Sequence, residues 1–231
     1  VHTAYKPELR QYGMDWPPFG FTMVGKQRLE NFRAAIAEVN RNNIDGAIME
    51  LGVWRGGDMI TAAAVLKEAG FQRHLYVMDA CENIPGYKAM GDFLSVSEKD
   101  VRGAFDFFHV GGDHVHFVKG LFKDTVPTWK DKTLQNDPIA VLRVDGNFYD
   151  SYQDAMYYMY DKVPVGGIVI FDDVMSHKPV MQFWNDFKAD QGLPEELNRI
   201  DLHSAWFRKE KEILIDFSKM HPPRDANLPP Q

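Results

Sequence analysis

Apolar residues recur along the chain with two different periods, and the two kinds of segment alternate. Between Lys26 and Asn40 the apolar positions Leu29, Phe32, Ile36 and Val39 are three or four residues apart, which predicts an amphipathic helix. Short and almost continuously apolar runs predict buried strands at 47–51, 75–78, 115–118, 139–144 and 167–171. Further helices are predicted at 58–67, 97–108, 150–162 and 179–189.

Strands that alternate with helices predict an α/β fold, in which a mostly parallel sheet is covered by helices on both faces. Residues 205–208 and 213–217 flank a short charged segment, which predicts an antiparallel hairpin at the end of a seven-stranded sheet. The main domain is expected to span 26–220. Residues 1–25 contain Trp16-Pro17-Pro18 and read as an arm or lid, and 221–231 as an extended tail.

Composition narrows the class of protein. The 231 residues include 26 Lys and Arg against 33 Asp and Glu, so the net charge is −7, and 45% of the residues are hydrophobic. These values predict a folded core and argue against a nucleic-acid partner, which would require clustered basic residues. No apolar run is long enough for a membrane span, and no secretory signal is recognised. The single cysteine, Cys81, excludes an intramolecular disulfide and is compatible with a reducing cytoplasm.

The candidate chemistry follows the predicted strands, because ligands of open α/β sheets bind outside the carboxyl ends of the strands. The first strand runs into Glu50-Leu51-Gly52-Val53-Trp54-Arg55-Gly56-Gly57, in which glycines allow a tight turn and close approach of a ligand. Asp79 follows the second strand and is placed to accept hydrogen bonds from ribose hydroxyls. Together they predict an adenosine-containing cofactor.

Three more carboxylates follow strands. Asp145 comes after the run 139–144, and Asp172 and Asp173 come after 167–171. Side by side they would repel one another, and a divalent cation relieves such repulsion. Oxygen ligands favour Mg²⁺. The alternative interpretation is that each aspartate caps the helix that follows it.

Several motifs resemble the macrocin O-methyltransferase (TylF-type) family. They are Thr22-Met23-Val24-Gly25, the segment 50–57, Asp79 with Glu82 and Pro85, Phe93–Ser97, Val118-Lys119-Gly120 with Phe122–Thr125, the segment 141–149, and Gly166-Gly167 with Asp172-Asp173. They occur in order across 16–185.

The resemblance implies a Rossmann-like class I methyltransferase fold, an N-terminal lid at 16–25, and methyl transfer from S-adenosylmethionine to a hydroxyl. It implies a Mg²⁺ site at Asp145, Asp172 and Asp173. The cofactor contacts that it implies, together with the neighbours we include, are Thr22, Met23, Glu50, Leu51, Gly52, Val53, Trp54, Arg55, Asp79, Ala80, Cys81, Glu82, Phe122 and Asp145.

The chain also departs from the family pattern. It has Ala80-Cys81-Glu82-Asn83 after Asp79, where the family reads Ser-Phe-Glu-Gly, and Asn147 stands where the family has an aspartate. The loss of that carboxylate removes one candidate base. We assign the general base to Asp145, because it should lie between the cofactor and the metal. His177 is the alternative because its ordinary pKa of about 6.5 suits proton transfer near neutral pH.

Two other classes of function remain open at this point. A nicotinamide-dependent oxidoreductase would use the same glycine turn and Asp79 without the carboxylate set, and a non-catalytic protein would bind the cofactor without turnover. For a methyltransferase, the resemblance favours a sugar hydroxyl of a natural product as acceptor, although another vicinal diol suits the same metal geometry. The apolar N-terminal segment is compatible with a homodimer.

Overall fold

A seven-stranded sheet forms the centre of the protein. The computed structural model describes residues 7–82, 91–132 and 137–222. The strand order is β3-β2-β1-β4-β5-β7-β6. The first five strands in this order are parallel to one another, and β7 runs antiparallel to both of its neighbours, β5 and β6. The strands are β1 (Ala47–Leu51), β2 (Leu75–Asp79), β3 (Val115–Lys119), β4 (Ile139–Val144), β5 (Ile168–Phe171), β6 (Asn198–Arg199) and β7 (Ala205–Arg208).

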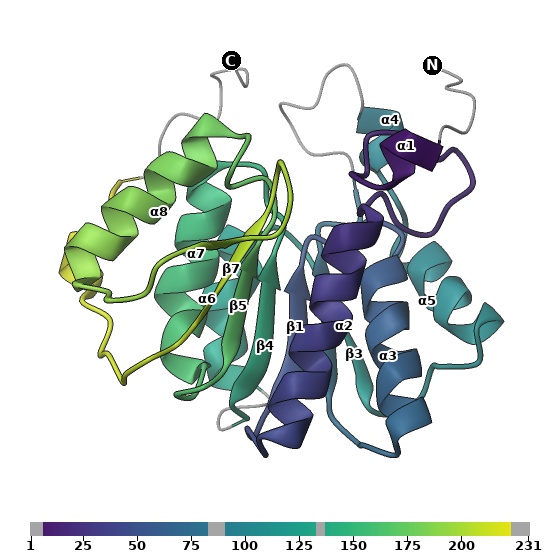
Figure 1. Ribbon diagram of the computed structural model, residues 1–231, viewed down its shortest axis with the longest axis horizontal. Coiled ribbons are helices and arrows are strands. Elements are labelled where there is room, and N and C mark those ends of the chain that lie inside the picture. The colour runs from purple at the N-terminus through teal and green to yellow at the C-terminus, as the bar shows by residue number, and fades with distance from the viewer. Residues whose placement is uncertain (1–6, 83–90, 133–136, 223–231) are drawn as a thin grey trace.

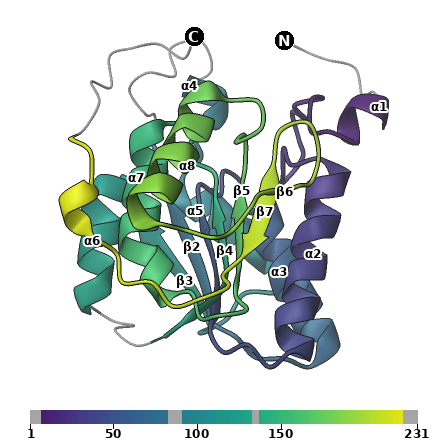
Figure 2. The ribbon, with the colours of Figure 1, turned by 60° about the vertical axis from the view of Figure 1, so that its left-hand side comes forward.

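Helices cover both faces of this sheet (Figure 1). The long helices α2 (Lys26–Arg41), α3 (Gly57–Ala69) and α5 (Glu98–Phe107) cover one face. The opposite face is covered by α6 (Phe122–Lys132), α7 (Tyr149–Met159) and α8 (Lys178–Gln191), as the turned view also shows (Figure 2). The shorter elements are α1 (Pro7–Arg10), α4 (Gly91–Leu94), η1 (Tyr160–Lys162) and η2 (Phe217–Lys219).

The alternation of side chains along the central strands divides the core into two clusters. In β4, Leu142 and Val144 pack against α7 and α8, whereas Val141 packs against α2 and α3. Successive strand residues point to opposite faces, so Arg143 is directed toward α2 and α3. By the same alternation Glu50 in β1 shares that side with Ile48. Two charged side chains are therefore held under α2 and α3 in an otherwise apolar layer.

The predicted fold class is confirmed, and so are the five parallel strands and the strand at 205–208. The predicted strand at 213–217 is wrong, because β7 pairs instead with β6, in the register Asn198 with Trp206 and Arg199 with Ala205. In 213–217, Ile215 is buried but Leu214 is 91% exposed. Residues 213–217 are therefore held by the buried side chain of Ile215 and not by the backbone hydrogen bonds of a paired strand.

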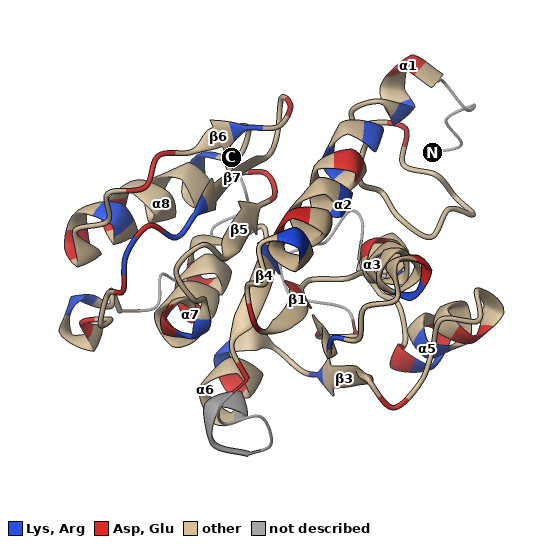
Figure 3. Ribbon diagram, turned by 60° about the horizontal axis from the view of Figure 1, so that its bottom comes forward, with Lys and Arg blue, Asp and Glu red and all other residues tan. Residues whose placement is uncertain are grey.

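Other elements extend or add to the sequence prediction. Helix α6 was not predicted, since its apolar residues are few and Pro127 lies inside it. The arm contains the short helix α1, and of the predicted tail only His221 and Pro222 lie within the described residues. Charges of both signs occur on α2, α5 and α8 (Figure 3), in keeping with the absence of a basic cluster from the sequence. Within the described ranges, every helix is too short or too polar to cross a bilayer.

Candidate active site

The turn after β1 lies against the end of β4. Gly52 adopts φ +91°, and its N–H donates to the carbonyl of Met78 at 2.8 Å. A Cβ at this position would lie 2.0 Å from the carbonyl oxygen of Asp145, so the position requires glycine. The N–H of Asp145 in turn donates to the carbonyl of Leu51 at 2.8 Å. The glycine turn and Asp145 are therefore in direct contact.

The carboxylate of Asp79, at the end of β2, binds the backbone of the same turn. Its Oδ2 accepts hydrogen bonds from the backbone N–H groups of Val53 at 2.9 Å and Trp54 at 3.0 Å, and its Oδ1 accepts one from Cys81 at 2.8 Å. Burial raises the pKa of Asp79, and these backbone donors oppose the shift. Burial also raises the pKa of the neighbouring Cys81 to about 12, so its thiol is protonated at neutral pH and is not a nucleophile.

The N-terminal arm docks on the start of α3. The N–H of Gly57 donates to the carbonyl of Phe21 at 2.9 Å, and the hydroxyl of Thr22 donates to Oδ1 of Asp58 at 2.7 Å. Arg55 donates from Nη1 to the carbonyls of Pro18 at 3.0 Å and Gly20 at 2.8 Å. The arm predicted at 16–25 is thus joined to the glycine turn by both backbone and side-chain hydrogen bonds.

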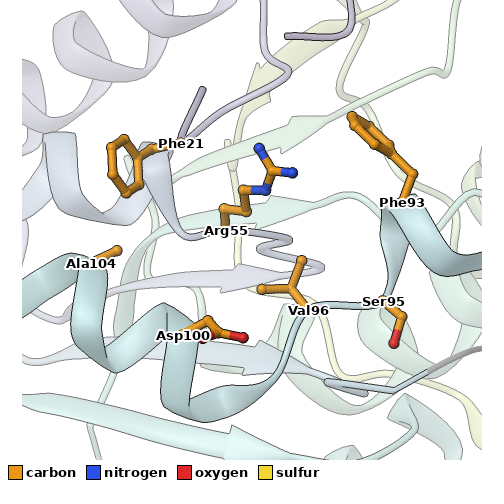
Figure 4. A pocket seen from close by; sticks show the side chains of 7 residues that line it. All are labelled: Phe21, Arg55, Phe93, Ser95, Val96, Asp100 and Ala104. Atoms are coloured by element: carbon orange, nitrogen blue, oxygen red, sulfur yellow. The ribbon is translucent and has the colours of Figure 1, made fainter. Parts of the chain in front are cut away.

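An aromatic cluster surrounds Arg55. Its guanidinium lies 4.1 Å from the ring centroid of Trp54 and 5.4 Å from that of Phe93, and Trp16 of the arm stacks on Phe93 at 5.7 Å. Figure 4 shows Arg55 between Phe21 and Phe93 at a cavity of about 350 Å³. The remaining lining residues are Ser95, Val96, Asp100 and Ala104. The guanidinium of Arg55 is therefore engaged by the arm and by aromatic rings.

The three predicted acids at the ends of β4 and β5 meet two arginines. Arg143 is buried and forms an ion pair with Asp172, and its Nη1 lies 3.3 Å from Oδ2 of Asp145. Arg28 of α2 approaches Asp172 from the other side, with Nη1 2.5 Å from Oδ1. The hydroxyl of Ser204, in the loop between β6 and β7, also donates to Asp172 at 2.5 Å. Asp172 is consequently surrounded by donors.

This arrangement gives the three aspartates different affinities for protons. Burial raises the pKa of Asp145, and the negative charge of Asp172 adds to that shift. The same two causes raise the pKa of Asp173. Burial also disfavours the charged form of Asp172, but Arg28, Arg143 and Ser204 stabilise it and hold its pKa below the ordinary value. Asp172 is the fixed anion of the set, and Asp145 is the stronger base.

The charges and contacts of these carboxylates bear on whether they can hold a divalent cation. The mutual repulsion that raises the pKa values of Asp145 and Asp173 is what a bound cation would relieve. The orientation of Asp172 toward Arg28 and Arg143 is less suitable, and within the described ranges no three His, Cys, Asp or Glu side chains form a ready metal-ligand group. The charges of the set fit Mg²⁺, whereas the pairing of Asp172 with Arg28 and Arg143 does not.

Comparison with known proteins decides the family. Residues 1–209 match the family described as macrocin-O-methyltransferase (TylF). The chain belongs to the TylF family. It is 35% identical over 223 residues to demethyldecarbamoylnovobiocin O-methyltransferase from Streptomyces niveus, a match that covers 90% of this chain and 83% of the relative. Mycinamicin III 3''-O-methyltransferase from Micromonospora griseorubida is 30% identical, with 90% and 86% covered.

The solved structures agree with this assignment. The O-methyltransferase NovP superimposes with a TM-score of 0.84 at 35% identity, over 90% of this chain and 89% of that one. The calicheamicin methyltransferase CalS11 shares the fold at 20% identity, with a TM-score of 0.61 over 78% of each chain. The TylF-family chain is therefore an S-adenosylmethionine-dependent O-methyltransferase with the Rossmann-like class I fold. The oxidoreductase and non-catalytic alternatives are wrong.

The remaining predicted residues of this TylF-family protein lie around the same edge of the sheet. His177 precedes α8, its N–H donates to the carbonyl of Asp173 at 2.7 Å, and burial lowers its pKa. The ring of Phe122 lies beside Gly146, since a Cβ there would be 3.3 Å from the ring. Asn147 adopts φ +59°, a conformation that asparagine tolerates better than most residues. Glu82 is exposed, and Pro85 lies outside the described residues.

Four polar residues of the TylF-family site were missed by sequence reasoning. They are Arg28, Asp58, Arg143 and Ser204. The signal was present for Arg143, because an arginine inside the apolar run 139–144 must find a buried anion. Asp58 directly follows the two glycines of the turn and lies in the first turn of α3. Arg28 lies far from the strand ends in sequence and gave no signal. Ser204 directly precedes β7, but a serine at the start of an antiparallel strand does not by itself indicate a site.

Proposed function

We propose that the protein transfers the methyl group of S-adenosylmethionine to a hydroxyl of a sugar carried by a natural product, with assistance from Mg²⁺. One observation carries the proposal. The glycine turn, Asp79 and the carboxylates of Asp145, Asp172 and Asp173 meet at one edge of the sheet. This is where ligands of open α/β sheets bind.

The cofactor fits the polar groups at this edge. Oε2 of Glu50 is buried and accepts no hydrogen bond from the described residues, and it suits the amino group of the methionine part of the cofactor. Asp79 retains acceptor capacity for ribose hydroxyls beside its backbone donors. The proposed cofactor contacts are Thr22, Met23, Glu50, Leu51, Gly52, Val53, Trp54, Arg55, Asp79, Ala80, Cys81, Glu82, Phe122 and Asp145.

The reaction is an in-line displacement. The acceptor oxygen bonds to the methyl carbon, the carbon–sulfur bond breaks with its electron pair moving to sulfur, and the hydroxyl proton passes to a base. Asp145 is our proposed base, because it lies between the glycine turn of the proposed cofactor site and the other carboxylates of the proposed metal site. His177 is the alternative, since burial keeps its imidazole neutral and able to accept a proton.

Asp145, Asp172 and Asp173 are the residues that would hold Mg²⁺. A cation there supplies Lewis acidity that lowers the pKa of an acceptor hydroxyl. The support for this proposal is the repulsion among the three carboxylates.

The names of relatives support a glycosylated acceptor. A relative from Streptomyces olivaceus, 31% identical over 213 residues, is named as a 4'-O-methyltransferase of a rhamnosyl-tetracenomycin. Others are named for novobiocin and mycinamicin compounds. A sugar hydroxyl of a large natural product is therefore the acceptor class that we propose. We further propose that the enzyme is cytoplasmic and forms homodimers.

The test is a calorimetric titration with S-adenosylmethionine, with and without Mg²⁺, followed by assays with glycosylated natural products and with EDTA. Micromolar cofactor binding and methylation of a sugar hydroxyl that EDTA abolishes are the expected results. Turnover that persists in EDTA would refute the Mg²⁺ proposal alone. Absence of cofactor binding in both titrations would contradict the proposed cofactor site.

A further inference from the structure

Arg143 is a buried cation that touches four carboxylates from four places in the fold. It forms ion pairs with Glu50 of β1 and Asp172 after β5, its Nε lies 3.4 Å from Oδ2 of Asp58 in α3, and its Nη1 lies 3.3 Å from Oδ2 of Asp145. A guanidinium has five N–H donors fixed in one plane. Its Nη groups donate hydrogen bonds to Glu50, Asp145 and Asp172, which set its orientation. Asp58 adds an ionic contact at Nε without a hydrogen bond, so a displacement of Asp58 changes the electrostatic force on the guanidinium.

One of the four acids is also held by the arm. Oδ1 of Asp58 accepts the hydroxyl proton of Thr22 at 2.7 Å, while Oδ2 of the same carboxylate faces Arg143. The oxygen of Thr22 accepts a hydrogen bond from the N–H of Val24 at 3.0 Å, which fixes the hydroxyl in this direction. A continuous line of polar contacts thus runs from the arm through Asp58 and Arg143 to Asp145.

The arm reaches the same acids by a second route. Arg28 donates from Nη2 to the carbonyl of Tyr12 at 2.6 Å, and its Nη1 and Nε pair with Asp172 and with Asp201 at 3.1 Å. Thr22 belongs to the arm, and Arg28 lies just after the arm, in the first turn of α2. The docked arm therefore reaches the acid network at two points: Thr22 contacts Asp58 directly, and Tyr12 is joined to Asp172 through Arg28 of α2.

We propose that docking of the arm positions Asp145 for proton transfer, with Thr22, Asp58 and Arg143 as positioning residues. This inference rests on the proposed function. With the arm docked, Thr22 fixes the carboxylate of Asp58, Asp58 attracts the guanidinium of Arg143, and Arg143 holds Oδ2 of Asp145. When the arm leaves, Asp58 loses its hydroxyl donor and turns further toward Arg143, which releases Asp145. The enzyme transfers methyl groups efficiently only with its arm closed.

The first experiment removes the hydroxyl of Thr22 and keeps its shape. We expect Thr22→Val to lower kcat about tenfold, the equivalent of about 1.4 kcal/mol in the barrier, with little change in KM for the acceptor. Thr22→Ser restores the hydroxyl and should restore kcat. Thr61→Val is the matched control, because its hydroxyl donates only to the carbonyl of Gly57 within α3. An unchanged kcat in Thr22→Val, or a change confined to Kd, overturns the inference.

A second pair of variants tests the path. Asp58→Asn keeps a hydrogen-bond acceptor for Thr22 but removes the charge that faces Arg143. If the path is correct, Thr22→Val has no further effect on kcat in the Asp58→Asn background. Additive effects of the two changes would show that Thr22 acts independently of Asp58 and would refute the path.

Hydrogen exchange separates this inference from the proposed function. Thr22→Val should accelerate amide exchange at 145–149 in the protein without substrates, and Thr61→Val should not. This measurement needs no turnover. If the unmodified protein methylates no glycosylated acceptor, the proposed function fails while exchange still reports on the coupling. If exchange at 145–149 is identical in the two variants, the coupling fails whatever the activity.

Discussion

Single positions show how closely the site is built into the backbone. Gly52 and Gly70 both adopt positive φ, +91° and +71°, yet their surroundings differ. A Cβ at Gly52 would collide with the backbone of Asp145, whereas a Cβ at Gly70 would meet nothing within 4 Å. A comparison of the two glycines therefore separates two effects of an added Cβ on stability: the strain of a positive φ, which both share, and the steric clash with the backbone, which only Gly52 has.

We therefore expect Gly52→Ala to lower the free energy of unfolding by about 3 kcal/mol, because it adds a steric clash to the strain of a positive φ. Gly70→Ala should lower it by about 1 kcal/mol, through the strain alone. Urea denaturation of both variants measures the difference. Equal losses would mean that the turn after β1 can move away from β4.

Replacement of Asp145 by asparagine keeps the shape of the side chain and removes its basicity. We expect Asp145→Asn to lower turnover by about 10²- to 10⁴-fold, the range for loss of a general base, and to leave cofactor affinity largely unchanged. Steady-state kinetics and calorimetry measure the two quantities. Full activity in this variant would transfer the role of base to His177 or to another group.

Acids at the strand ends were predictable from the sequence, but their partners were not. Asp79, Asp145, Asp172 and Asp173 stand out because each directly follows an apolar run. The hydrogen bond from Ser204 and the ion pair with Arg28 join residues 32 and 144 positions away from Asp172. Local patterns contain no information about such long-range contacts, so the prediction gave the anions without the cations that orient them.

The arm is the element that connects most segments of the site. Arg55 joins it to the glycine turn through the carbonyls of Pro18 and Gly20. Trp16 adds a stacking contact with Phe93, which follows β2 in the chain. These contacts are few compared with those of a core helix, so the arm should open without unfolding of the sheet.

Arg55→Met removes the two hydrogen bonds and keeps much of the contact with the rings of Trp54 and Phe93. We expect limited proteolysis within residues 7–24 to accelerate about 5- to 30-fold, as a loss of 1–2 kcal/mol from the docked state implies. Arg102→Met is the control, since Arg102 lies over the ring of Phe117 and pairs with Glu98 of its own helix. Equal cleavage rates in the two variants would contradict the proposed role of Arg55.

The packing of α6 on α7 places Asp154 in an unfavourable position. Burial raises the pKa of Asp154 to about 7, and Asp150 and Asp124 add to the shift while Lys123 opposes it. The folded state thus keeps a proton that the unfolded state gives up at lower pH. Stability should fall as the pH rises from about 4 to about 7.

Asp154→Asn abolishes this titration. Its melting temperature, relative to that of the unmodified protein, should therefore be higher at pH 8 than at pH 4.5. Asp113→Asn, at an exposed position before β3, should show no such gain. Thermal scans at the two pH values test the prediction. A relative melting temperature of Asp154→Asn that does not change with pH would show that Asp154 is ionised in the folded protein.

Elements were predictable wherever the apolar pattern was strong. The strands at 47–51 and 139–144 have their predicted bounds, since they are buried on both faces and apolar except at Glu50 and Arg143. The partner of β7 was not predictable, because Asn198 and Arg199 are exposed and polar and pair through their backbone. Strand pairing at an exposed edge depends on backbone hydrogen bonds more than on side-chain character.

The whole molecule is one sheet with an apolar cluster on each face. Both clusters include side chains of β1 and β4, because successive residues of a strand serve opposite faces. If one cluster loses its packing, β1 and β4 are destabilised, and the other cluster loses its packing with them. The two halves of the core should therefore unfold together.

We expect urea unfolding to give one transition with the same midpoint by far-ultraviolet and near-ultraviolet circular dichroism. The first signal reports the helices and strands, and the second reports the packing of aromatic rings such as Tyr152 and Trp184. Two separate midpoints would indicate independent units within 26–220 and would contradict the single domain.

The contacts of Arg28 also bear on the order in which the protein can be completed during synthesis. Arg28 is translated well before Asp172 and Asp201, with which it pairs. The arm has no complete docking site until β5 and the loop before β7 have formed. The arm is therefore translated before its docking site and is among the last segments to reach its final place. A nascent chain that stalls before residue 172 would carry its arm undocked and open to proteases and chaperones.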